Sequence, residues 1–180
     1  METTTYRKPL LTGMFSDRES AEKAYSSLHE RGYSKDDVNV IMSDDTRKKH
    51  FSSDKSGKAD SDLGNKAVEG LGTGSAIGGA LGAIAGVVAA VGTSIVLPGL
   101  GLVIAGPIAA GLAGAGAGGI TGGLIGALVG WGIPEDRAKR YEEGLKSGKI
   151  VMGVHPKNEE DAKHFENHWR NHKAEDVYTH

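Results

Sequence analysis

Cysteine is absent from this chain of 180 residues, so it can form neither a disulfide framework nor a thiol nucleophile. An excess of positive charge is also missing. The net charge is −2 at pH 7 and no basic patch with interleaved aromatic residues stands out, so there is no reason to expect a nucleic-acid partner. The first eight residues have no apolar run behind them, and we therefore expect no secretory signal there.

Charged side chains are missing from a long stretch of the chain, from Gly70 to Pro134. Within it, glycines recur at every fourth position in two rows that mirror each other about position 100. Glycine accounts for 28 of the 180 residues, about twice its usual share of roughly 7%. The first row is Gly70, Gly74, Gly78, Gly82 and Gly86, and the second is Gly114, Gly118, Gly122, Gly126 and Gly130.

This spacing predicts a helical hairpin over 67–133. A period of four places residues on one face of an α-helix, and a break at 98–101 would fold the two glycine faces together. The arms 70–97 and 107–131 would be about 42 Å and 38 Å long, more than the roughly 30 Å core of a bilayer. The tip between them carries no polar side chain. We therefore expect an antiparallel glycine-zipper hairpin with transmembrane helices, and membrane lipid and further copies of the chain as its partners.

The composition of the second arm leaves two alternatives open. Residues 109–119 are nearly all glycine and alanine, which makes this arm a poor membrane segment and favours a protein neighbour. A buried hairpin inside a soluble assembly is the first alternative. A disordered glycine–alanine linker is the second, although the regular glycine register argues against it.

The N-terminal flank is typical of a strand, a helix and a second strand. An apolar run at 9–15 has the length of a strand. Ser16 and Glu19 form a capping box for a helix that Gly32 would end. The second strand is expected at 37–42.

The C-terminal flank repeats this plan, with helices from Pro134 to Gly148 and at 158–173 and strands at 149–154 and 176–178. Two βαβ halves of this size favour one four-stranded antiparallel sheet with helices on one face, a ferredoxin-like arrangement. The expected fold class is therefore α+β, with the hairpin inserted between the second and third strands. The expected segments are a first half at 1–43, a polar linker at 44–66, the hairpin at 67–133 and a second half at 134–180.

Candidate chemical sites are few. His164, His168 and His172 recur every fourth residue, a spacing at which two histidines can share a metal ion. A solvated histidine edge is the alternative, because no cysteine or Glu-x-x-His pattern accompanies them. The glycines at 72–78 lack the Lys-Ser/Thr of a phosphate-binding loop. The paired carboxylates at 36–37 and 142–143 are expected at a turn and on a solvated helix face. We therefore expect no catalytic residue and no cofactor.

Two stretches resemble a known family. Residues 16–24, with Gly32-Tyr33 and 37–41 after them, are similar to the start of bacterial general-stress (heat-induced stress) proteins. Residues 132–144 resemble the segment after the glycine-rich region in those proteins and in low-temperature-induced ones. The resemblance implies a stress-linked, membrane-associated protein, and it brings no catalytic residues.

Three functions are consistent with these patterns. The first is a non-enzymatic protein that self-associates through the glycine hairpin in or on a membrane, with its polar domain on the cytoplasmic side. The second is a soluble oligomer whose shared apolar interior binds lipid or another apolar ligand. The third is a pore-forming oligomer, for which the few polar residues of the arms offer little ion selectivity.

Overall fold

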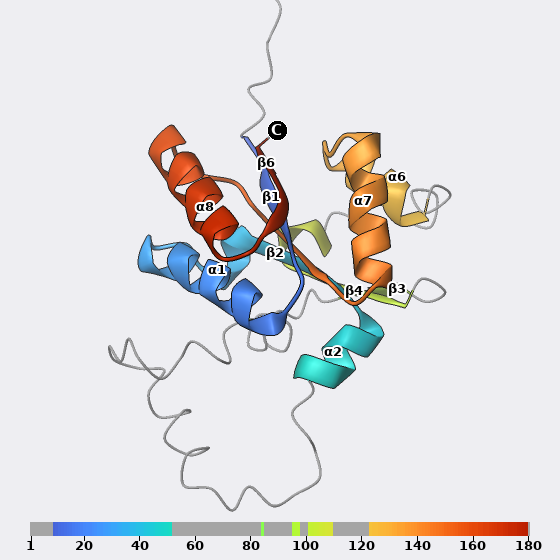
Figure 1. The fold of residues 1–180 in the computed structure, drawn as a ribbon. Coiled ribbons are helices and arrows are strands. Elements are labelled where there is room, and N and C mark those ends of the chain that lie inside the picture. The colour runs from blue at the N-terminus through green and yellow to red at the C-terminus, as the bar shows by residue number, and fades with distance from the viewer. Residues whose placement is uncertain (1–8, 52–83, 85–94, 98–100, 110–122, 180) are drawn as a thin grey trace, which may run out of the picture.

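The computed structural model describes residues 9–51, 84, 95–97, 101–109 and 123–179, and they form an α+β fold around an antiparallel sheet (Figure 1). The sheet has six strands in the order β3-β4-β2-β5-β1-β6. The strands are β1 (Leu11–Phe15), β2 (Val38–Ser43), β3 (Ile95–Leu97), β4 (Leu102–Ala105), β5 (Ile150–Val154) and β6 (Glu175–Thr179). The helices are α1 (Arg18–Glu30), α2 (Asp44–Phe51), α6 (Gly123–Gly130), α7 (Glu135–Lys146) and α8 (Glu159–Asn171), with a short 3-10 turn at Lys35–Asp37.

The helix starts follow from their capping side chains. Asp17, and not Ser16 as expected, caps α1 by accepting a hydrogen bond from the Ser20 amide at 2.7 Å. The Ser16 hydroxyl instead donates to Glu175 of β6 at 2.7 Å. At α8, the Asn158 side chain accepts from the Asp161 amide at 2.7 Å, so this helix begins at the predicted place.

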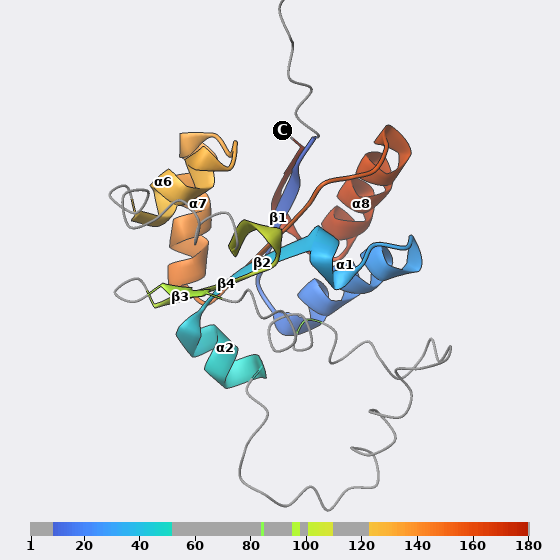
Figure 2. The ribbon, with the colours of Figure 1, turned by 180° about the vertical axis from the view of Figure 1, so that it is seen from behind.

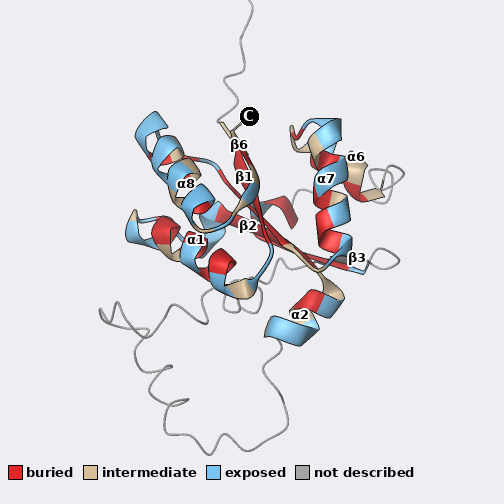
Figure 3. Ribbon diagram, in the orientation of Figure 1, coloured by how far each residue is buried: buried red, intermediate tan, exposed pale blue. Residues whose placement is uncertain are grey.

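Helices cover both faces of the sheet, which corrects the expectation that they lie on one face. Helices α1 and α8 pack on one side and α6 and α7 on the other, as Figures 1 and 2 show from opposite directions. Along β5, Ile150 and Met152 belong to the α1–α8 core, and Val151 belongs to the α6–α7 core. The sides of the helices that face the sheet are buried and their outer sides are exposed (Figure 3). A central strand with apolar residues on both faces requires a covering layer on each.

One strand, at 95–97, lies at the end of the first predicted arm, so the helix prediction is wrong there, and a second strand, at 102–105, lies in the predicted tip. There β3 pairs with β4, and β4 pairs with β2 through contacts such as Ile41 with Ile104. Val103 and Ile104 are 2% and 1% exposed. Their branched side chains fit a sheet better than a helix, and the edge of β2 supplies the backbone partners. Residues 102–105 of the predicted tip are thus buried by the chain itself.

The expectation of transmembrane helices is also wrong. None of the helices in the residues that the structure describes is long and apolar enough to cross a membrane. The eight residues of α6 span about 12 Å, against roughly 30 Å of bilayer core. The rest of the predicted hairpin, at 67–83, 85–94, 98–100 and 110–122, lies outside the described residues.

A helix also occupies the start of the predicted polar linker, because α2 spans Asp44–Phe51. Acidic residues lie in its first turn and basic residues in its last, which complements the helix dipole. Thr46 fixes it to the body, since its hydroxyl donates to the Gly148 carbonyl at 3.2 Å and the residue is 5% exposed. The linker from 52 onward lies outside the described residues.

Asp161 joins the two halves of the chain on the α1–α8 side. It is 6% exposed and accepts hydrogen bonds from Arg31 at 2.5 Å and from the Tyr33 hydroxyl at 2.7 Å. Burial acts to raise the pKa of this carboxyl, but the hydrogen bonds from Tyr33 and Arg31 outweigh burial and hold it below its usual value of 3.8. The charged form of Asp161 therefore stabilises the contact between the end of α1 and the start of α8.

Gly106 permits the turn that follows β4. Its φ is +107°, and an added Cβ would lie 2.3 Å from the Val38 carbonyl oxygen. The close approach lets the Ile108 amide donate to the buried Asn39 side chain at 2.9 Å. A side chain at 106 would strain the backbone, because φ is positive, and would clash with the Val38 carbonyl oxygen.

Two glycine-to-alanine changes are expected to act in opposite directions. Gly106→Ala should lower the free energy of unfolding by about 3 kcal/mol, because it adds both positive-φ strain and a backbone clash. Gly126→Ala, on helix α6 where a built Cβ meets no described atom within 4 Å, should raise it by about 0.5 to 1 kcal/mol through helix propensity. Urea denaturation measures both, and equal effects would contradict the assigned backbone environments.

Asp161→Asn should destabilise the protein at neutral pH by about 1 to 3 kcal/mol, because it replaces the charged acceptor of Arg31 and Tyr33. Since the folded pKa of Asp161 is depressed, its stabilisation is complete above the unfolded pKa and is lost as pH falls through the folded one. The gap between the two proteins should thus be constant above about pH 5 and shrink below about pH 4. Denaturation curves from pH 3 to 7 test this, and a gap that does not change with pH would contradict it.

Candidate functional site

Helix α6 carries Gly126 and Gly130, two of the ten glycines predicted to form a helix-packing interface. The other eight are outside the described residues: Gly70, Gly74, Gly78, Gly82, Gly86, Gly114, Gly118 and Gly122. The predicted meeting of the two rows therefore stays a prediction, and the structure bears only on the end of the second row.

The inner face of α6 is apolar and packed. Leu124 and Leu128, one turn apart, are 3% and 2% exposed and belong to the core that α6 and α7 form on the sheet. At 100° per residue, Gly126, Val129 and Gly130 lie on the opposite face. Val129 is 43% exposed, although it is a large apolar residue. The outward face of α6, defined by these three residues, is thus an apolar surface without a polar side chain.

Both glycines of this face have open space around them. A Cβ built on Gly126 or Gly130 meets no atom of the described structure within 4 Å. Gly144 of α7 differs, because a Cβ there would overlap the Met14 sulfur of β1. Gly144 thus serves close packing inside the described fold, and the α6 glycines do not. Their lack of side chains leaves room for another helix to approach the α6 backbone.

The buried Tyr141 anchors α7, the helix that packs against α6, to the sheet. The Tyr141 hydroxyl lies 2.8 Å from the Thr12 hydroxyl of β1 and donates to the Asp176 carbonyl of β6, also at 2.8 Å. Tyr141 and Thr12 are both 0% exposed. Burial raises the pKa of Tyr141 to about 12, so the hydroxyl stays protonated and keeps its donor. The apolar pattern of this helix in the sequence gives no signal for the polar role of Tyr141.

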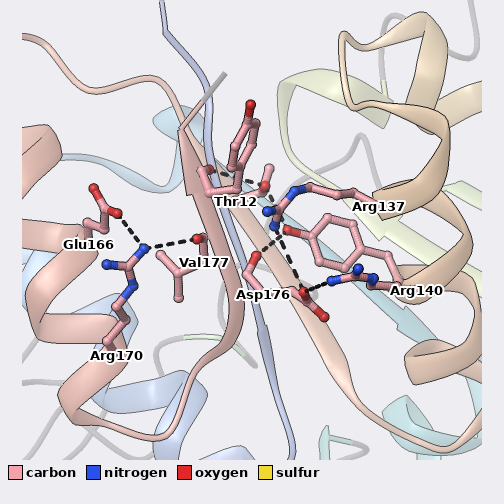
Figure 4. Close-up of polar contacts among 9 residues, drawn as sticks. Thr12, Arg137, Arg140, Glu166, Arg170, Asp176 and Val177 are labelled. Atoms are coloured by element: carbon pink, nitrogen blue, oxygen red, sulfur yellow. Dashed lines mark hydrogen bonds and ion pairs between the residues drawn. The ribbon is translucent and has the colours of Figure 1, made fainter.

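Charged side chains complete the junction between α7 and β6 in Figure 4. Arg140 donates to the Asp176 carboxylate at 2.9 Å, and an Arg137 nitrogen lies 3.9 Å from the same oxygen. The Arg137 guanidinium lies over the Tyr178 ring at 4.0 Å. On the α8 side of β6, Arg170 pairs with Glu166 and donates to the Val177 carbonyl at 3.3 Å. Asp176 has a φ of +49°, a conformation held by these contacts. These contacts hold α7 against β6, and their role is structural.

The three candidate histidines lie along one edge of α8. The ring centroids of His164 and His168 are 5.9 Å apart, and those of His168 and His172 are 4.2 Å apart. Burial, followed by the neighbouring His172 and His164, lowers the pKa of His168. Among the described residues, no group of three or more histidine, cysteine or carboxylate side chains is arranged to hold a metal ion.

The paired carboxylates have structural partners. Asp37 accepts hydrogen bonds from the Ser34 amide and hydroxyl, both at 2.8 Å, which caps the 3-10 turn and lowers the pKa of Asp37. Glu142 pairs with Lys146 at 2.9 Å along the exposed side of α7. Asp37 thus stabilises a turn, and Glu142 forms an ion pair on the surface of a helix.

The coupling of Tyr141 to Thr12 can be measured by a double-mutant cycle. Tyr141→Phe should lower the free energy of unfolding by about 1 to 3 kcal/mol, because it leaves the Asp176 carbonyl without this donor and the Thr12 hydroxyl without this acceptor. Thr12→Val alone should lower the free energy of unfolding by less, because Tyr141 keeps its hydrogen bond to the Asp176 carbonyl. The two losses should be non-additive by at least about 0.5 kcal/mol, and additive losses would mean that the two hydroxyls do not interact.

Comparison with known proteins finds no matching family model, no matching curated protein and no matching solved structure. The function is therefore inferred from the residues and contacts of this chain.

Proposed function

We propose that this chain is a non-enzymatic protein that self-associates through the outward face of α6 and the glycine row that leads into it. The observation that carries the proposal is that, among the described residues, no atom lies within 4 Å of a Cβ built on Gly126 or Gly130, whereas Leu124 and Leu128 on the inner face of the same helix are buried. Glycines in a helix weaken it by about 1 kcal/mol each relative to alanine. A packing partner offsets that cost, because small residues let two helix backbones approach and gain dispersion contacts.

The rest of the domain would serve as a rigid support for this surface. We infer that β1, β2, β5 and β6, with α1 and α8, form a ferredoxin-like domain, because their order in the sheet is β2-β5-β1-β6 and each half has the order strand, helix, strand. The segment between β2 and α7 would then be an insertion. The resemblance to bacterial general-stress proteins supports a role in a stress response.

A lipid surface on the cytoplasmic side is one proposed place of assembly, because the outward face of α6 is apolar and exposes Val129. A soluble oligomer with a shared apolar interior is the second candidate. The burial of β4 in the chain's own sheet favours it, since these apolar residues need no lipid to cover them. Both candidates use the same helix contact.

Adding bulk on the glycine face should disrupt the assembly. The double variant Gly126→Leu/Gly130→Leu should weaken self-association at least tenfold in sedimentation velocity, because the side chains keep a second helix away. The matched control is Lys139→Leu, which adds the same side chain at an exposed position of α7 and should leave association unchanged. Association that is equal in the double variant and the wild type would refute the proposal.

A flotation assay separates the two places of assembly. Full-length protein is mixed with vesicles of phosphatidylglycerol and phosphatidylethanolamine and centrifuged through a density gradient. Flotation of the wild type supports assembly on lipid, and recovery as a defined oligomer below the vesicles supports the soluble assembly.

A further inference from the structure

Strands β3 and β6 form the two edges of the sheet, and β6 is protected against pairing with a further strand. The Val177 carbonyl of β6 accepts a hydrogen bond from the Arg170 guanidinium at 3.3 Å. The pairing of β6 with β1 is also irregular, because the register shifts between Thr12 and Met14 and Asp176 has a φ of +49°. An occupied acceptor, a shifted register and charged side chains are features that keep an edge strand from pairing with another chain.

Strand β3 differs from β6 in each of these respects. Its three residues pair with β4 in an unbroken register. It lies within the uncharged stretch 70–134, so neither β3 nor its neighbours in sequence supply a lysine or arginine to protect the edge. Among the strands that the structure describes, β4 is the only neighbour of β3. The outer edge of β3 is therefore suited to accept a further strand.

The hydrogen bonds of β4 determine which backbone groups of β3 face outward. The Asp44 amide donates to the Gly101 carbonyl at 2.7 Å and continues the register of β2 with β4. In an antiparallel ladder, hydrogen-bonded pairs alternate with non-hydrogen-bonded pairs, so Met42 and Val103 form the next hydrogen-bonded pair. Val103 thus bonds to β2, and its two neighbours on β4 point their N–H and C=O groups toward β3.

The same alternation assigns the backbone groups of Val96, the middle residue of β3. Ile95 and Leu97 are paired with the two neighbours of Val103, so they make the hydrogen bonds of the β3–β4 ladder. Val96 is paired with Val103 itself, which bonds to β2, and this pair is therefore non-hydrogen-bonded. The N–H and C=O groups of Val96 point away from β4, toward the outer edge of the sheet.

We propose that a second copy of the chain docks on the outer edge of β3, antiparallel to it, with Val96 paired to Val96. A donor and an acceptor on one residue are complementary to themselves about a two-fold axis, because each copy donates to and accepts from the other. The contact joins the two sheets edge to edge. It is separate from the outward face of α6 and does not depend on the self-association proposed there. A chain with both contacts can form assemblies larger than a dimer.

Amide hydrogen exchange of the full-length protein, followed by NMR at several concentrations, tests the pairing. The Val96 amide should exchange at least tenfold more slowly in concentrated than in dilute protein, because it gains an acceptor only in the dimer. The amides of Ile95 and Leu97 are internal controls and should be equally protected throughout, since β4 binds them in either state. Protection of Val96 at every concentration would mean that the same chain covers the edge, and free exchange at every concentration would mean that the edge stays open. Either result overturns the proposal.

Val96→Pro supplies the mutational test, in the Gly126→Leu/Gly130→Leu background that lacks the proposed α6 contact. Proline removes the outward N–H and keeps the bonds to β4, so it should weaken the residual self-association at least tenfold in sedimentation velocity. Leu97→Pro is the matched control for folding, because it removes an amide that bonds to β4 and should lower the unfolding midpoint more than Val96→Pro does.

The outcomes for the two contacts can be told apart. Residual association that Val96→Pro leaves unchanged contradicts the strand pairing, whereas association that the double glycine variant leaves unchanged contradicts only the α6 contact. The exchange measurement on the wild type decides the matter if Val96→Pro fails to fold.

Discussion

Burial of the central strands on both faces is the constraint on which the rest of this structure depends. Every residue of β1 and β5 is buried, so neither face of the sheet can be left to water. The amphipathic helices α1 and α8 cover one face. The other requires apolar residues from the middle of the chain and from α7, and it draws α6, α7 and the turn at Gly106–Ala109 onto the sheet. Helix α6 lies where it does because this second face of the sheet must be covered by apolar residues.

On the face covered by α6 and α7, helix α7 approaches the sheet closely and few polar groups are buried between them. Gly144 lets α7 lie directly on Met14, and Tyr141 satisfies a buried hydroxyl and a strand carbonyl with one oxygen. Helix α6 packs beside α7 with Leu124 and Leu128 buried and Ile125 partly buried against the same core. Its glycines are left on the far side, where they contribute nothing to the described fold. A residue type that weakens a helix and has no packing role among the described residues fits a contact made by the outward face of α6.

Local signals in the sequence predicted the flanking elements well. The strands near 11–15, 38–43 and 150–154 and the helices that follow their caps all lie within a few residues of the expected places. The middle of the chain was harder, because a run of Ile, Val and Leu between glycines fits a helix and a strand equally well. The pairing of Ile104 with Ile41, more than sixty residues earlier, decided the matter. Helix α2 was missed for a similar reason, since Thr46 is held by the distant Gly148 carbonyl.

By itself, the sequence determined the features that depend on neighbours a few residues apart: helix caps, apolar stripes, an uncharged glycine-rich middle and three histidines in register. Only the tertiary structure decided which face each helix covers, that residues 102–105 join the sheet, and that Gly126 and Gly130 lie on the outward face of α6. The physical reason is range. Capping and periodicity act within one or two turns of chain, whereas strand pairing and the covering of a sheet face depend on contacts between residues that are far apart in sequence.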